Sequence, residues 1–181
     1  MILAFVIAAA VLIADIISKV IISSSFELYY SEAFIPGILN ITNISNDGIA
    51  FGMLDNARWL FMAATAVLIV ILLGIVIFAK GYHKLVYACA GLVLGGGAGN
   101  FVDRILKLGL YDEPGCVVDF IDFCAFPELW RWTFNVADIG VCVGAGLFIL
   151  YLVAFDKKSY ENGLKSVVYE QKKTDGNDTN E

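Results

Sequence analysis

Histidine is almost absent from this chain, because His83 is the only one among 181 residues. A Ser–His or Cys–His nucleophile pair needs a histidine beside the reacting group, and zinc is usually held by histidine. These chemistries therefore depend on where His83 lies. Basic residues are also outnumbered, and the net charge of -6 argues against binding of nucleic acid, which needs a basic surface.

Cysteine is sparse too, and none of the four cysteines shows C-x-x-C spacing. We expect Cys89 and Cys142, which lie in apolar segments, to be small core residues. Cys116 and Cys124 share one loop, and the sequence leaves open whether they pair.

Apolar residues, in contrast, are abundant: they make up 59% of the chain, and the mean hydropathy is +0.77. A soluble domain is nearer half apolar. Four segments, residues 1–22, 58–79, 85–102 and 134–155, each have close to the roughly 20 residues that cross about 30 Å of hydrocarbon. We predict an all-α membrane protein with four transmembrane helices, forming one domain over residues 1–155.

The first segment lacks a basic region at its start, so we interpret it as a retained helix and not as a cleaved signal peptide. It contains Asp15 and Lys19, which are one helical turn apart and face the same way. One interpretation is an ion pair that neutralises both charges as the helix inserts. The other is support for an active site, and both can hold together.

The placement of lysine predicts the orientation, because cytoplasmic loops carry an excess of basic residues. Lys80 and Lys84 lie in the link between the second and third segments, and the tail over residues 156–181 is rich in lysine. The loop over residues 23–57 has no lysine or arginine. We therefore expect both termini and the polar tail in the cytoplasm, with His83 also on that side.

The outer loop before the second segment has the composition of β-structure. FELYY and ILNITNI are rich in aromatic and β-branched residues, and Pro36-Gly37 and Asn46-Asp47-Gly48 are turn signals. We predict a small extracytoplasmic β-rich element over residues 26–54. The apolar stretch over residues 116–121 is too short to cross the membrane, and it either dips into the interface or pairs as a strand.

In this topology the polar residues of three segments fall at one depth, in the outer leaflet. They are Asp15, Lys19, Asn100, Asp103, Arg104, Asn135 and Asp138. Ionisable residues in a membrane segment usually face the interior of a bundle or a cavity. Glycines at four-residue spacing let helices approach closely, at positions 91, 95, 99, 140 and 144. Close packing predicts that Asn100 lies near Asn135 and Asp138.

Asp138 is a lone carboxylate in an apolar helix and needs a partner. Asp119 is the favoured one, since it lies in an apolar stretch at the same membrane face, and Asp122 is the rival. Two adjacent carboxylates cannot both ionise easily, so one keeps a proton. One carboxylate can then take a proton from water while the other polarises a carbonyl group.

Three other functions remain open on the sequence. A Ser23–Lys19 pair is a possible nucleophile and base, because Ser23 lies one turn beyond Lys19. Asp103, Asp119, Asp122 and Asp138 are candidate ligands for a hard cation such as Mg²⁺. A non-enzymatic membrane protein, such as a small proton-coupled transporter, also places charged residues within the membrane.

Taken together, the segments resemble the lipoprotein signal peptidases (signal peptidase II), the membrane aspartic peptidases of bacteria. The resemblance covers residues 1 to about 155. It is carried by five blocks in order: Asp15-Ile-Ile-Ser-Lys19, Asn43-Ile-Ser-Asn-Asp-Gly-Ile-Ala-Phe51, Gly95-Gly-Gly-Ala-Gly-Asn-Phe-Val-Asp-Arg104, Val117-Val-Asp-Phe120 and Phe134-Asn-Val-Ala-Asp138.

The resemblance implies an endopeptidase that cuts a prolipoprotein before its diacylglyceryl-modified cysteine, at the extracytoplasmic side of the bacterial plasma membrane. It implies a catalytic pair of Asp119 and Asp138, with no metal and no organic cofactor. Residues that support the site or hold substrate would be Asp15, Lys19, Asn46, Gly48, Asn100, Arg104, Asn135 and Ala137. The implied partners are the lipidated substrate and membrane lipid, and we expect a monomer.

Overall fold

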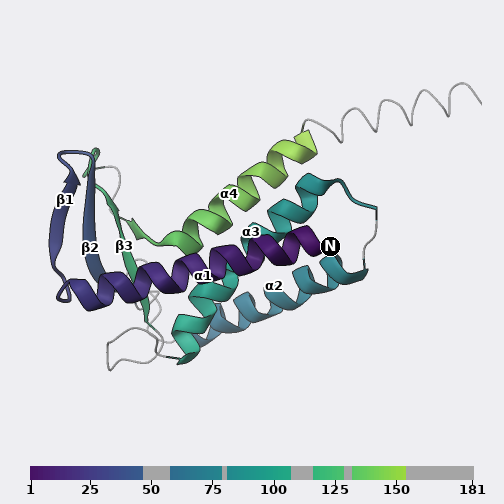
Figure 1. Ribbon diagram of the computed structural model, residues 1–181, viewed down its shortest axis with the longest axis horizontal. Helices are drawn as coiled ribbons and strands as arrows, with labels where there is room; N and C mark the ends of the chain where they lie inside the picture. Colours follow the sequence, from purple (N-terminus) through teal and green to yellow (C-terminus); the bar gives the residue numbers. More distant parts are fainter. Residues whose placement is uncertain (47–57, 79–80, 107–115, 129–131, 154–181) are drawn as a thin grey trace, which may run out of the picture.

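The computed structural model contains four helices and a small sheet (Figure 1) and describes residues 1–46, 58–78, 81–106, 116–128 and 132–153. The helices are α1 (Ile2–Ser25), α2 (Arg58–Phe78), α3 (Lys84–Leu106) and α4 (Val136–Tyr151). The predicted helices are thus all present. The polar tail over residues 156–181 lies outside the described residues.

Two helix ends differ from the prediction for local reasons. α1 continues to Ser25, and the hydroxyl groups of Ser23 and Ser24 donate to carbonyl oxygens one turn earlier. α4 begins two residues later than predicted. Thr133 and Phe134 pair as a short strand, and Asn135 caps the helix.

Within the described ranges, the sheet is antiparallel with four strands in the order β1-β2-β3-β4. The strands are β1 (Ser31–Ile35), β2 (Leu39–Asn46), β3 (Val117–Phe123) and β4 (Thr133–Phe134). The β-rich element predicted before the second helix is therefore present, although its residues 47–54 lie outside the described part. The apolar stretch after α3 pairs as a strand with β2, which was one of its two expected forms.

Three helices pack closely through glycine, as the four-residue spacing predicts. A Cβ atom on Gly91 would overlap the backbone of Ala4 in α1, and one on Gly144 of α4 would overlap the carbonyl oxygen of Cys89 in α3. α3 is therefore in backbone contact with both α1 and α4. α2 differs, because its packing is mainly against α3.

The helices present large apolar side chains outward, for example Val70 and Phe78 on α2 and Leu150 on α4. Among the described residues, two helices are long and apolar enough to cross a membrane, Ile2–Ser25 and Lys84–Ile105. Met62–Phe78 and Val136–Tyr151 are shorter apolar helices. Buried charges therefore lie inside a bundle whose exterior is apolar.

The sheet lies beside the end of α1 that is farthest from the N-terminus (Figure 1). A small apolar cluster joins the two, with Ile22 of α1 packed near Val118 and Phe120 of β3. This contact holds β3 against the bundle and brings the residues that follow Val118 to the polar end of the helices.

Candidate active site

Asp119 is the third residue of β3 and lies opposite Ile44 of β2. Its carboxyl group is buried, and each oxygen accepts one hydrogen bond from an amide. The Nδ2 of Asn46 donates to Oδ2 at 2.6 Å, and the Nδ2 of Asn135 donates to Oδ1 at 2.6 Å. Both strands and the start of α4 therefore position this carboxyl group.

Burial raises the pKa of Asp119 to about 7, because desolvation disfavours the charged form. The hydrogen bonds from Asn46 and Asn135 act in the opposite direction, and the neighbouring charge of Asp138 raises the pKa further. A carboxyl group with a pKa near neutrality can both give and take a proton at physiological pH.

Asp138 sits in the first turn of α4, where it forms a capping box with Asn135. The backbone N–H of Asp138 donates to Oδ1 of Asn135 at 2.9 Å, and the backbone N–H of Asn135 donates to Oδ2 of Asp138 at 3.1 Å. The other carboxyl oxygen, Oδ1, accepts from Nδ2 of Asn100 at 2.7 Å. The helix start and α3 together fix the orientation of this side chain.

Asn135 is the residue that links the two carboxyl groups. Its Nδ2 donates to Asp119 and, at 3.1 Å, to Oδ1 of Asn100, while its Oδ1 caps Asp138. The structure thus brings Asp119 and Asp138 to one site, joined through two asparagines. Their catalytic roles stay predictions.

Two side chains of α1 contact residues that hold or adjoin the aspartates. The Nζ of Lys19 contacts Asp15 at 2.6 Å, Asp103 at 2.7 Å and Oδ1 of Asn100 at 3.0 Å. The second oxygen of Asp15 accepts the backbone N–H of Ala137 at 2.9 Å. Lys19, Asp15 and Asp103 are all buried, so these charges compensate one another away from water.

Asp103 was not among the predicted supporting residues, although it holds the ammonium group of Lys19. The sequence did contain a signal for it. Asp103 is the only acidic residue at the outer end of the third apolar segment, and Lys19 is the only basic residue at the same depth of the first.

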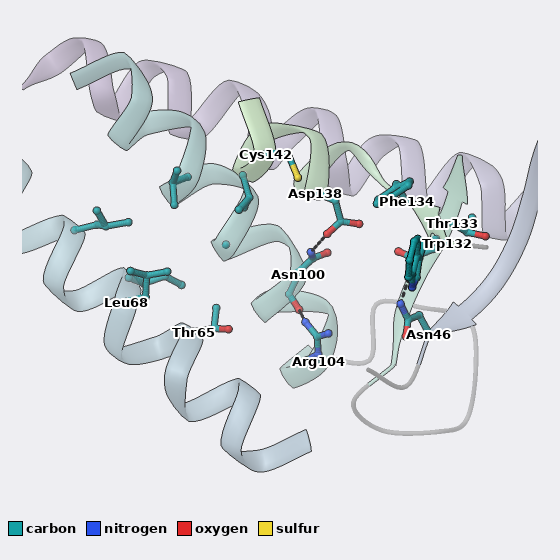
Figure 2. A pocket seen from close by; sticks show the side chains of 16 residues that line it. Asn46, Thr65, Leu68, Asn100, Arg104, Trp132, Thr133, Phe134, Asp138 and Cys142 are labelled. Atoms are coloured by element: carbon teal, nitrogen blue, oxygen red, sulfur yellow. Dashed lines mark hydrogen bonds between the residues drawn. The ribbon is translucent and has the colours of Figure 1, made fainter. Parts of the chain in front are cut away.

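A cavity of about 410 Å³ opens beside Asp119 and Asp138, and we call it the catalytic cavity (Figure 2). Asn100 and Arg104 line it from α3, and Arg104 donates to the backbone oxygen of Asn100 at 3.2 Å. The predicted residue Asn46 also lines it. Predicted residue Gly48 lies outside the described residues, and Ala137 acts through its backbone.

The catalytic cavity is also lined by residues that were not predicted as site residues, among them Thr65, Trp132 and Cys142. The expectation that Cys142 is a core residue is wrong, because it is exposed on α4 one turn after Asp138. Its apolar neighbours in the sequence do not indicate which side of the helix faces the cavity. Cys89 is buried as expected.

The rival arrangements are not formed. Asp122 accepts a hydrogen bond from Asn40 at 3.0 Å and does not line the catalytic cavity, because residues three apart on a strand point to opposite faces. The hydroxyl of Ser23 donates to the backbone oxygen of Lys19 and not to its Nζ. Cys116 and Cys124 are unpaired thiols.

The four aspartates that were candidate ligands for a hard cation are divided among different partners. Within the described part of the chain, no group of three His, Cys, Asp or Glu residues is arranged to hold a metal ion. Asp103 instead holds Lys19, and Asp122 holds Asn40.

Comparison with known proteins gives a consistent result. The family model described as signal peptidase (SPase) II matches residues 7–154. The chain is 36% identical over 156 residues to the lipoprotein signal peptidase of Symbiobacterium thermophilum, covering 86% of this chain and 97% of that protein. It is 34% identical over 164 residues to the lipoprotein signal peptidase of Nitratidesulfovibrio vulgaris, covering 87% and 92%.

A solved bacterial membrane enzyme has a similar fold, with a TM-score of 0.73 and 32% identity over 84% of this chain and 93% of that structure. A second structure of a bacterial membrane enzyme gives a TM-score of 0.71 at 33% identity. The range of the family model includes Asp119, Asp138, the described strands and most of each helix. The chain therefore belongs to the signal peptidase II family of bacterial membrane proteases.

Proposed function

We propose that this chain is an intramembrane aspartic endopeptidase that cuts diacylglyceryl-modified prolipoproteins immediately before the lipidated cysteine. Family membership makes it a protease of lipoprotein processing. The observation that carries the proposed chemistry is the joint placement of Asp119 and Asp138. Both line one cavity, and both are held by Asn135.

In the proposed reaction the pair shares one proton and holds a water molecule between the two carboxyl groups. The ionised carboxylate takes a proton from the water molecule while the water oxygen forms a bond to the scissile carbonyl carbon. The protonated carboxyl group donates a hydrogen bond to the carbonyl oxygen. The C–N bond of the resulting intermediate then breaks, and the leaving amine takes a proton from the pair.

The surrounding side-chain amides would hold the two carboxyl groups in a fixed orientation. Asn100 and Asn135 each bridge a carboxyl group to another part of the site, so neither aspartate can rotate freely. Arg104 would hold a polar group of the substrate, because its guanidinium lines the same cavity. The role of Lys19 would be to keep Asn100 in place through its contact with Oδ1.

We further propose that α1, α2, α3 and α4 all cross the plasma membrane, with both termini in the cytoplasm. The active site then faces the extracytoplasmic side, and the substrate enters from the outer leaflet. Support comes from the placement of lysine and from the collection of buried polar residues at the end of the bundle that carries the sheet. We propose that a monomer is sufficient, because the described residues of one chain already bring both carboxyl groups together with the asparagines that hold them.

A proton-coupled transporter was the alternative, and the comparisons lend it no support. It makes a distinct prediction, because a transporter moves label across vesicles without cutting any peptide. Transport without cleavage by the purified protein would reverse our conclusion.

The direct test is cleavage of a synthetic lipidated precursor by purified variants. We expect Asp119→Asn and Asp138→Asn each to lower kcat/KM by roughly 10²–10⁴-fold, the usual contribution of a general acid or base. Asp122→Asn is the matched control on the same strand and should keep near-normal turnover, because its partner Asn40 lies away from the cavity. Near-normal turnover by a folded Asp119→Asn or Asp138→Asn variant contradicts the mechanism.

A further inference from the structure

A second cavity, of about 260 Å³, lies between α2, α3 and α4 and is lined almost entirely by apolar side chains. We call it the apolar cavity. Ile75, Val86 and Phe148 mark the part of it farthest from the aspartates. Among the described residues, the thiol of Cys89 is the only side chain with a polar atom in this lining, so the cavity is unsuited to water or to a peptide backbone.

The apolar cavity adjoins the catalytic cavity. Leu68 and Leu72 of α2 and Val93 of α3 line both. Figure 2 shows Leu68 between α2 and α3, on the side of the catalytic cavity away from Trp132. At about 1.5 Å per helical residue, the path along α4 from Asp138 to Phe148 is roughly 15 Å long.

We propose that the apolar cavity receives one acyl chain of the diacylglyceryl group on the substrate cysteine. This inference rests on the proposed function. The glycerol and its esters would lie near Asn100 and Arg104, and the acyl chain would run between α2 and α4 toward Phe148. An outer-leaflet lipid has the same order of polarity, with polar groups at the surface and hydrocarbon toward the middle of the bilayer.

The size of the apolar cavity favours an acyl chain over the apolar helix of the signal peptide. A helix about 10 Å wide and roughly 15 Å long needs on the order of 1,000 Å³. The apolar cavity, of about 260 Å³, is too small for such a helix but admits a narrow hydrocarbon chain. An extended peptide would also leave backbone N–H and C=O groups without partners in this apolar surrounding.

The packing of α3 is looser on the side that faces this path. A Cβ atom on Gly97, which lines the catalytic cavity, would meet nothing closer than the Ile69 side chain at 3.7 Å. The neighbouring Gly96 is in backbone contact with α4. The two glycines thus distinguish a face of α3 that leaves no space for a side chain from a face that accommodates a methyl group.

The test uses the full chain in detergent micelles and two synthetic substrates with the same peptide. Both carry a diacylglyceryl cysteine, one with palmitoyl chains and one with butanoyl chains. Ala145→Phe fills the apolar cavity, because Ala145 lines it and does not line the catalytic cavity. Ala10→Phe is the matched control, since Ala10 is exposed on α1 and lines neither cavity.

For Ala145→Phe we expect the ratio of kcat/KM for the palmitoyl over the butanoyl substrate to fall about tenfold, the effect of leaving roughly two methylene groups unburied. The control should keep the wild-type ratio. An unchanged ratio in Ala145→Phe overturns the inference while leaving the proposed function intact. Failure of the wild type to cut either substrate defeats the proposed function itself.

Phe148→Ala provides a second variant that does not depend on the first one folding. It lengthens the apolar cavity at its far end, and Phe148 is 40% exposed, so little packing is lost. We expect the ratio of kcat/KM for stearoyl over palmitoyl substrate to rise several-fold. If Ala145→Phe cuts neither substrate, an unchanged ratio in Phe148→Ala overturns the inference.

Discussion

The two sides of α3 are packed in different ways. Toward α1 and α4 the helix presents Gly91 and Gly96, which leave no space for a side chain, and this side carries the buried ion pairs. Toward α2 it presents Val93 and Gly97, and two adjoining cavities lie there. One helix therefore separates a closed, polar scaffold from an open, apolar path.

This difference suggests a division of labour. A catalytic pair needs fixed geometry, and close packing with hydrogen bonds to both carboxyl groups provides it. A lipidated substrate needs a lateral entrance, and a helix packed mainly on one neighbour provides room for it. Changes on the closed side should therefore alter stability, whereas changes on the open side should alter substrate preference.

The largest effect on the closed side should come from Lys19→Met. Removing the ammonium group leaves Asp15 and Asp103 buried without their partner, and breaking a buried ion pair in this way costs about 3–5 kcal/mol. Thermal unfolding in detergent measures the loss. Lys84→Met, at the exposed start of α3, is the control. Equal unfolding temperatures for both variants would show that the ion pairs do not stabilise the fold.

Adjacent glycines compare the two sides of α3 most directly. Gly96→Ala forces a methyl group against the carbonyl oxygen of Ala137 and should cost about 1–3 kcal/mol. Gly97→Ala meets only the Ile69 side chain at 3.7 Å, and alanine is the better helix former by about 1 kcal/mol. Unfolding temperatures should therefore move in opposite directions. A similar loss in both variants would remove the distinction between the two sides.

The smallest expected effect is a shift in pH dependence. Because the pKa of Asp119 is about 7, kcat/KM should fall as the pH rises above that value and the pair loses its shared proton. Asn46→Ala removes a hydrogen bond that favours the ionised form, so the pKa should rise further and this decline should move up by about one pH unit. A pH profile of kcat/KM measures the change, and a shift to lower pH would contradict it.

The same group affects stability with a defined sign. The folded protein keeps a proton on Asp119 that the unfolded chain releases at lower pH. The contribution of this proton to the free energy of unfolding is therefore full below the ordinary pKa of aspartate. It is lost as the pH rises through about 7. The unfolding temperature of Asp119→Asn, measured across this pH range, should depend less on pH than that of the wild type. If the variant and the wild type depend on pH equally, another group is responsible for the pH dependence.

The helices and the polar cluster could be predicted from the sequence because charged residues are rare in segments that cross hydrocarbon. Asp15, Lys19 and Asp138 stand out in apolar runs, and the glycine spacing indicated which helices approach closely. These inferences needed only composition and periodicity. The β-rich element was likewise indicated by its aromatic and β-branched residues.

The choice between Asp119 and Asp122 was not accessible from local pattern. Both lie in one apolar stretch, and which of them faces the cavity depends on how β3 pairs with β2, where the register shifts between Ile41 and Ile44. Only the family resemblance favoured Asp119 decisively. Cys142 and Thr65 were missed for a similar reason, since the rotation of a nearly uniform apolar helix leaves little trace in its sequence.

The position of Lys19 one turn after Asp15 has a consequence for the order of synthesis. The ribosome completes α1 long before it makes Asp103, the later partner of Lys19, or Ala137, the later partner of Asp15. Neither partner exists when α1 is made. Because the pair lies within one helix, each charge already has its counter-ion during this interval. The later segments then dock onto a first helix whose charges were balanced from the start.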